Sequence, residues 1–122
     1  MSALLDIRDL DLWLEARPPR RLLRRVSLQV APGQIVGLVG ESGAGKTMVS
    51  RVVLGIAPAN ARVTHGSVVF DGREITHLAH AQRRHLLGRE IAFIPQNPMT
   101  ALNPVERIEP QITDVLRMHL NL

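Results

Sequence analysis

The sequence contains no cysteine, and aromatic residues make up only 2% of its 122 residues. Without cysteine the chain forms neither disulfide bonds nor a thiolate metal site, and a reducing compartment is its natural location. With only Trp13, Phe70 and Phe93 available, a platform of stacked rings for single-stranded nucleic acid is hard to build. We therefore expect no nucleic-acid partner.

Long apolar runs are also lacking. No run approaches the roughly 20 apolar residues that a membrane-spanning helix needs, and the aspartates among the first eleven residues are unlike a secretory signal. At 13.5 kDa the chain has the size of one small domain or a piece of one. These features predict a protein that is soluble or peripheral to a membrane.

Lysine is the scarcest basic residue. Lys46 is the only lysine, so the other fourteen of the fifteen basic side chains are arginines. Only Arg20, Arg21, Arg24 and Arg25 cluster, and a charge run of this kind is typical of a solvated face.

The first third of the chain alternates in polarity and then becomes continuously apolar. Alternation at 10–14 and 26–30 predicts two half-buried strands joined by a loop at 15–21, and 31–34 predicts a turn. Residues 35–39 are apolar in succession, which predicts a strand covered on both faces of a parallel sheet.

A helical period begins at Lys46 and is predicted to stop at Pro58. Its predicted apolar face is formed by Met48, Val49, Val52, Val53 and Ile56.

The second half of the chain predicts shorter elements. Val68 and Phe70 belong to a strand that meets a hairpin-like turn at Asp71 and Gly72. Residues 78–88 predict a short exposed helix closed by glycine, and 91–94 a second buried strand. The tail predicts an amphipathic helix with Pro110 in its first turn. Its apolar face contains Ile112, Val115, Leu116 and Leu120.

The stretch GLVGESGAGKT at 37–47 contains the pattern G-x-x-x-x-G-K-[ST], placed between a predicted buried strand and a predicted helix. Glycines let the backbone turn its N–H groups toward phosphate oxygens, and the helix adds its positive dipole end. The compact ammonium of Lys46 reaches β and γ phosphates where the planar guanidinium of arginine fits badly. The hydroxyl of Thr47 is a ligand for Mg²⁺.

A second motif narrows the class. The stretch IAFIPQNPMTALNP at 91–104 places Gln96 after an apolar strand and before a proline-rich loop and a helix. It resembles the Q-loop of ABC transporter ATPases, and within them the branch that imports dipeptides, oligopeptides and nickel. The entry segment 26–34 and the stretch GSVVFDG at 66–72 resemble the same family, so the resemblance covers nearly the whole chain from Leu4 onward.

The resemblance implies an α/β fold: the P-loop NTPase core of an ABC ATPase with an N-terminal antiparallel β part, incomplete at its C-terminus. Residues 1–94 would form the N-terminal part of the nucleotide-binding core, and 95–122 the Q-loop and the start of the helical subdomain. The implied ligands are ATP and Mg²⁺, and Gln96 would contact the metal or the attacking water. The implied phosphate-binding residues are Gly40, Glu41, Ser42, Gly43, Ala44, Gly45, Lys46 and Thr47, of which Thr47 would also bind the metal together with Gln96.

The resemblance also implies partners and a location. These are the transmembrane permease subunits, reached through the Q-loop region, a second ABC ATPase subunit that is either a copy or a relative, and indirectly an extracytoplasmic binding protein. The location would be peripheral, on the inner face of the cell membrane. An aromatic residue that stacks on adenine is often found in the family at the position of Leu14, and Trp13 can serve only if the strand bulges there.

The largest departure from the family is what the 122 residues do not contain. No apolar run ends in Asp-Glu, and no L-S-G-G-Q segment occurs. We expect an N-terminal portion of an ABC ATPase that binds nucleotide without hydrolysing it alone, and whose segments 35–39 and 91–94 are left exposed. Two alternatives stay open: a nucleotide-binding remnant of an interrupted gene with no transport role, and another P-loop enzyme such as a small-molecule kinase.

Overall fold

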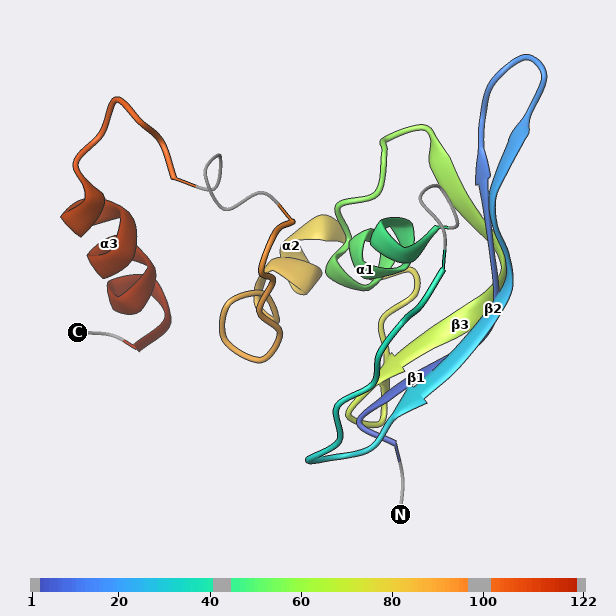
Figure 1. The fold of residues 1–122 in the computed structure, drawn as a ribbon, viewed down its shortest axis with the longest axis horizontal. Helices are drawn as coiled ribbons and strands as arrows, with labels where there is room; N and C mark the ends of the chain where they lie inside the picture. The colour runs from blue at the N-terminus through green and yellow to red at the C-terminus, as the bar shows by residue number, and fades with distance from the viewer. Residues whose placement is uncertain (1–2, 41–44, 97–101, 121–122) are drawn as a thin grey trace. The chain divides into compact units, whose positions relative to one another are not determined.

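The computed structural model describes residues 3–40, 45–96 and 102–120, and the chain divides into two compact units, Met1–Arg83 and Arg84–Leu122. The element order is β1 (Leu5–Leu14), β2 (Arg20–Val30), α1 (Lys46–Leu54), β3 (Ala61–Phe70), β4 (Arg73–Glu74), α2 (His80–Arg84) and α3 (Ile108–Leu120), as labelled in Figure 1. Within the described residues, no helix is long and apolar enough to cross a membrane.

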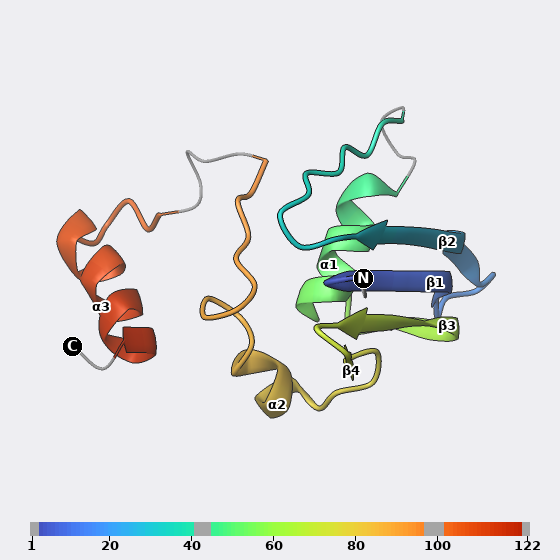
Figure 2. The ribbon, with the colours of Figure 1, turned by 90° about the horizontal axis from the view of Figure 1, so that it is seen from below.

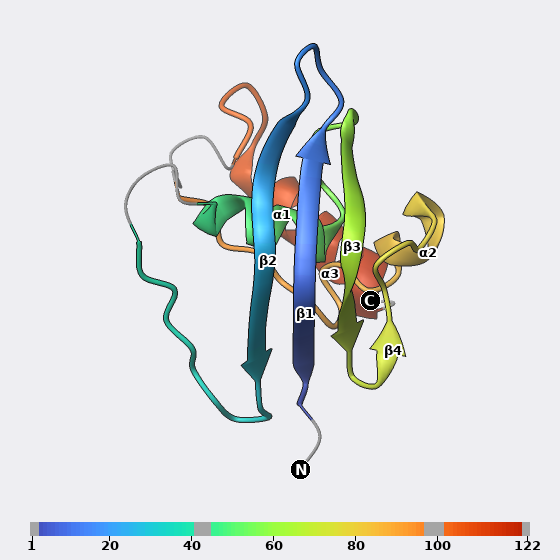
Figure 3. The ribbon, with the colours of Figure 1, turned by 90° about the vertical axis from the view of Figure 1, so that its right-hand side faces the viewer.

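The first unit is built on an antiparallel sheet of four strands in the order β2-β1-β3-β4, seen face-on in Figure 3. The alternating patterns at 10–14 and 26–30 are confirmed as parts of β1 and β2, and the connecting loop is shorter than predicted because β2 begins at Arg20. The predicted turn after β3 is also confirmed, with Asp71 and Gly72 at φ 50° and 77°. Two successive positive φ values are typical of the type I′ hairpin turn.

A β-bulge in β1 sets which residues face the core. Arg8 pairs with Ser67 and Asp11 with His65, so two residues of β1 lie opposite the single residue Gly66 of β3. Asp9 takes the extra place with φ 46°. Because of this extra residue, the side chains of Ile7 and Leu10, three positions apart, are both buried on one face.

Helix α1 lies against one face of the sheet, as Figure 2 shows. It ends at Leu54 with Gly55 in the left-handed conformation, so the predicted stop at Pro58 is wrong by one turn and Ile56 is exposed outside the helix. The core of this unit is apolar and is formed by residues of the sheet, of α1 and of the segment after β4: Ile7, Leu10, Leu12, Leu23, Val49, Val52, Val53, Leu54, Val68 and Ile75.

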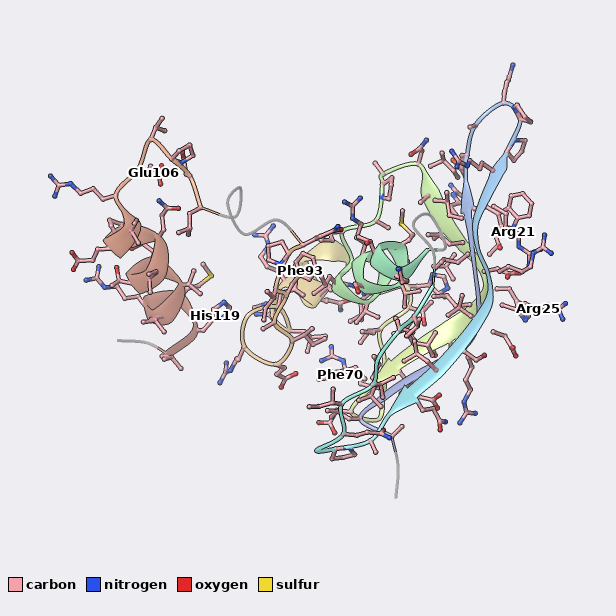
Figure 4. All side chains as sticks on the ribbon, viewed as in Figure 1. Arg21, Arg25, Phe70, Phe93, Glu106 and His119 are labelled. Carbon is pink, nitrogen blue, oxygen red and sulfur yellow. The ribbon has the colours of Figure 1, made fainter. Side chains whose placement is uncertain are left out.

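The opposite face of the sheet is polar. Arg21 and Arg25 project from β2 on the side away from α1 (Figure 4). The carboxylate of Asp11 accepts hydrogen bonds from the Arg21 guanidinium at 2.7 Å and the Arg25 N–H at 2.6 Å. The hydrogen bond from Arg21 is the main reason that the pKa of Asp11 lies below its ordinary value. The arginine cluster thus lies on an edge strand, where charge disfavours pairing with another chain.

Two predicted buried strands are not formed. Residues 35–40 have no regular structure, and the side chains of Ile35 and Val39 are 98% and 99% exposed. Residues 91–94 form only one bridge, between Ile91 and Leu87, and Ile94 is 90% exposed. A parallel strand exists only beside a neighbour that takes its N–H and C=O groups. Among the described residues, 35–40 has no such neighbour, and 91–94 has one only at Ile91. The predicted exposure of both segments is therefore confirmed, while their predicted strand structure is wrong.

The second unit contains the predicted tail helix, α3, with Pro110 in its first turn. The side chain of Gln111 holds the preceding loop: it accepts a hydrogen bond from the Asn103 N–H at 2.7 Å and donates to the carbonyls of Asn103 at 3.0 Å and Arg107 at 3.0 Å. The side chain of Gln111 thereby fixes this loop to the helix. The predicted apolar face of α3 is solvent-exposed within this unit.

The prediction of an exposed helix over 78–88 is wrong in length, and its exposure is wrong at two positions, Arg83 and Leu86. Helix α2 spans only five residues, His80–Arg84. The side chains of Arg83 and Leu86 are each only 6% exposed. Arg83 is buried because its guanidinium contacts α1.

Candidate phosphate-binding site

The site is built around the N-terminus of α1. Lys46 is the first residue of the helix, and Gly45 precedes it at φ 95°. Among the described residues, no side chain caps this end, and the first turn contains no acidic residue. The first N–H groups of a helix have no partner within the helix, and its dipole is positive at this end. The beginning of α1 is therefore suited to an anion.

Close packing fixes this end of α1 against the sheet. A Cβ atom added to Gly45 would lie 2.8 Å from Cδ2 of Leu23, a buried residue of β2. Only glycine combines this approach with a positive φ. The turn into the helix therefore lies directly on β2.

The ammonium of Lys46 donates a hydrogen bond to the carbonyl of Gly40. This contact joins the two described ends of the predicted phosphate loop. Thr47 is exposed at the first turn of the helix. The structure thus brings Gly40, Gly45, Lys46 and Thr47 together, whereas Glu41, Ser42, Gly43 and Ala44 lie outside the described residues.

Gln96 belongs to the second unit and is exposed. The residues 97–101 that follow it in the predicted Q-loop lie outside the described residues. In the part of the chain that the structure describes, no three histidine or acidic side chains gather at metal-binding distance. The roles of Gln96 and Thr47 toward a metal stay predictions.

Trp13 lies on the polar face of the sheet. The extra residue at this level of the β1–β2 pairing is Leu22 of β2, so β1 itself keeps its alternation here. The Arg21 guanidinium lies 5.6 Å from the centre of the indole ring, a cation–π distance. The bulge that Trp13 would need in order to turn toward the face of α1 is therefore absent from β1 at this position.

Sequence reasoning missed one residue of this region, Arg83. Its guanidinium donates hydrogen bonds to the carbonyls of Val52 and Val53, at the end of α1 opposite the phosphate loop. No sequence pattern marks it, because arginine is normally exposed and its neighbour Arg84 is exposed.

Comparison with known families identifies the class. A family model described as ABC transporter matches residues 23–118, so the chain belongs to the ABC transporter family. The same family contains, among solved structures, a bacterial Atm1-family ABC exporter with ATP bound, which superposes on 71% of this chain with a TM-score of 0.54 and 29% identity. This match covers 14% of the exporter chain.

Curated relatives narrow the similarity to peptide transport. The chain is 36% identical over 118 residues to the dipeptide transport ATP-binding protein DppD of Escherichia coli, which covers 96% of this chain and 36% of the relative. It is 35% identical over 120 residues to the oligopeptide transport ATP-binding protein AmiE of Streptococcus pneumoniae, covering 97% and 34%. The chain therefore spans about a third of the length of these relatives.

Proposed function

We propose that this chain binds MgATP through the loop 40–47 and the N-terminus of α1. The observation that carries the proposal is the start of α1, which no side chain of the described residues caps, beside Lys46, whose ammonium already bridges the two described ends of the loop. In the proposed complex Lys46 exchanges its contact with the Gly40 carbonyl for the β and γ phosphates. Thr47 then contributes its hydroxyl to Mg²⁺.

The proposed biological role is to energise import of peptides or a related substrate. It is supported by the names of the relatives, which are ATP-binding proteins of dipeptide and oligopeptide transport. In this role the region around Gln96 would meet transmembrane permease subunits at the inner face of the membrane, where an extracytoplasmic binding protein delivers substrate from the other side. A second ABC ATPase subunit would share the nucleotide. Gln96 would contact the metal or the attacking water and signal the nucleotide state.

Hydrolysis is not proposed for these 122 residues alone. A phosphoryl transfer to water needs a group that orients or deprotonates the water, in addition to the grip on the phosphates. The resemblance assigns that task to an Asp-Glu pair after an apolar run, and the 122 residues contain no such run. We propose binding without turnover.

The test is the affinity of the full chain for MgATP, measured by isothermal titration calorimetry. Lys46→Ala is expected to abolish measurable binding because the loop loses its only ammonium. Arg51→Ala is the matched control, since Arg51 is an exposed basic residue in the last turn of the same helix. Equal affinities of the Lys46 and Arg51 variants would refute the site, and ATP turnover that Lys46→Ala abolishes would refute binding without turnover.

A further inference from the structure

Arg83 is a buried cation that is held by carbonyl groups. Its side chain is 6% exposed, and in the described part of the chain no carboxylate forms an ion pair with it. Its guanidinium donates to the carbonyls of Val52 at 2.9 Å, Val53 at 2.8 Å and Thr76 at 3.4 Å, and also to the carbonyl of Ile75. Burial lowers the pKa of Arg83 because it removes water from the charged guanidinium. The surrounding carbonyls replace part of this lost hydration.

These carbonyls belong to two different elements. Val52 and Val53 lie in the last turn of α1, where the helix dipole is negative. The carbonyl of Val52 also accepts a hydrogen bond from the N–H of Gly55 at 3.1 Å. Ile75 and Thr76 follow β4 at the margin of the sheet. Arg83 therefore ties the C-terminal end of α1 to the sheet.

Thr76 continues this connection into the sheet. Its buried hydroxyl accepts a hydrogen bond from the Val68 N–H at 2.8 Å, and Val68 is a fully buried residue of β3. A continuous path of hydrogen bonds thus runs from β3 through Thr76 and Arg83 to the last turn of α1.

Gly55 leaves the space that this arrangement needs. A Cβ atom at Gly55 would lie 2.1 Å from Cδ of Arg83. The aliphatic part of Arg83 thus passes directly over the end of the helix. The contact is specific to this arginine, because the side chain of the adjacent Arg84 is exposed.

Helix α1 is consequently fixed at both ends. Its N-terminal turn rests on Leu23 through Gly45, and its C-terminal turn is held by Arg83. A helix of nine residues is a rigid rod of about 13 Å. A change of its direction at one end therefore moves the N–H groups and the Lys46 side chain at the other.

We propose that Arg83 is a positioning residue for nucleotide binding: by holding the C-terminal end of α1, it sets the direction in which the helix presents Lys46 and its first N–H groups to phosphate. The role rests on the proposed function, since it concerns the same site. Arg83 itself touches no phosphate, and its effect passes through the helix.

The test compares Arg83→Met, Arg83→Lys and the matched control Arg84→Met in the full chain. The first readout is the backbone amide resonances of Gly45, Lys46 and Thr47 in the nucleotide-free protein, measured by ¹H–¹⁵N NMR. The second is the MgATP affinity at a temperature where every variant is folded. We expect Arg83→Met to shift these resonances and to weaken MgATP binding about tenfold through lost preorganisation. Arg83→Lys should recover part of both effects, and Arg84→Met should change neither.

Each outcome decides one question. Unchanged resonances of residues 45–47 in Arg83→Met, or an affinity equal to that of Arg84→Met, would overturn the positioning role. If Arg83→Met does not fold, Arg83→Lys is judged by the same two readouts. A wild-type chain that does not bind MgATP refutes the proposed function, whereas the resonance shifts of the nucleotide-free protein still decide whether Arg83 directs the helix.

Discussion

Replacing Gly66 by alanine tests the β-bulge that shapes the sheet. Gly66 has φ 89°, and a Cβ atom there would lie 2.3 Å from the Asp9 carbonyl oxygen and 2.5 Å from that of Arg8. Real Cβ atoms do not approach backbone atoms so closely. The neighbouring atoms are backbone, so no side-chain rotation relieves the contact. Gly66→Ala must therefore separate β1 from β3 at the bulge.

The cost has two parts. Left-handed backbone costs alanine about 1–2 kcal/mol, and forcing a methyl group into a packed site costs about 1–3 kcal/mol more. We therefore expect Gly66→Ala to lower the free energy of unfolding by about 2–5 kcal/mol. For a unit of this size, the thermal midpoint should fall by about 8 °C or more.

The assay is thermal and urea unfolding followed by far-UV circular dichroism. Gly33→Ala is the matched control, because Gly33 has φ 75° and, among the described residues beyond its two chain neighbours, no atom lies within 4 Å of an added Cβ. It isolates the cost of the backbone conformation, about 1–2 kcal/mol. If Gly66→Ala is no less stable than Gly33→Ala, the close contact with the bulge does not exist and the pairing of Gly66 with Asp9 is wrong.

Two further predictions concern polar groups of the sheet. The pKa of Asp11 is depressed in the folded protein, so its carboxylate stabilises the fold above pH 3.8, its ordinary pKa, and this stability is lost as the pH falls through the lower native pKa. In urea unfolding between neutral and acid pH, Asp11→Asn should therefore lose less free energy of unfolding than the wild type. The control Asp71→Asn should lose as much as the wild type. Thr76→Val leaves the buried Val68 N–H without its hydroxyl acceptor, so the free energy of unfolding should fall by about 1–3 kcal/mol, while Thr76→Ser, which keeps the hydroxyl, should retain most of the stability.

Local patterns in the sequence predicted the elements that are stabilised locally. The alternation at 10–14, the turn at Asp71 and Gly72, and the start of a helix at Lys46 all depend on short-range backbone preferences and on one buried face. Two short motifs, at 37–47 and 91–104, likewise predicted the family that the matched family model shows.

The features that were missed or predicted wrongly depend on partners that are distant in sequence. The bulge at Asp9 is set by the approach of Gly66, 57 positions later, and alternation alone gives no sign of it. The burial of Arg83 depends on carbonyls about thirty positions earlier. The apolar run at 35–39 has the composition of a buried strand, but a strand forms only where a neighbour takes its backbone groups.

The phosphate loop is consequently supported from one side. On the side of α1, the core, Leu23 and Arg83 hold the helix in place. On the side of 35–40, no regular structure holds the backbone, and the apolar side chains of Ile35 and Val39 are almost fully exposed. In the proposed complex with MgATP, any conformational freedom that this segment loses would reduce the observed affinity. Any neighbour that paired with 35–39 would remove that cost before the nucleotide binds, so strand pairing at this segment and nucleotide affinity are thermodynamically coupled.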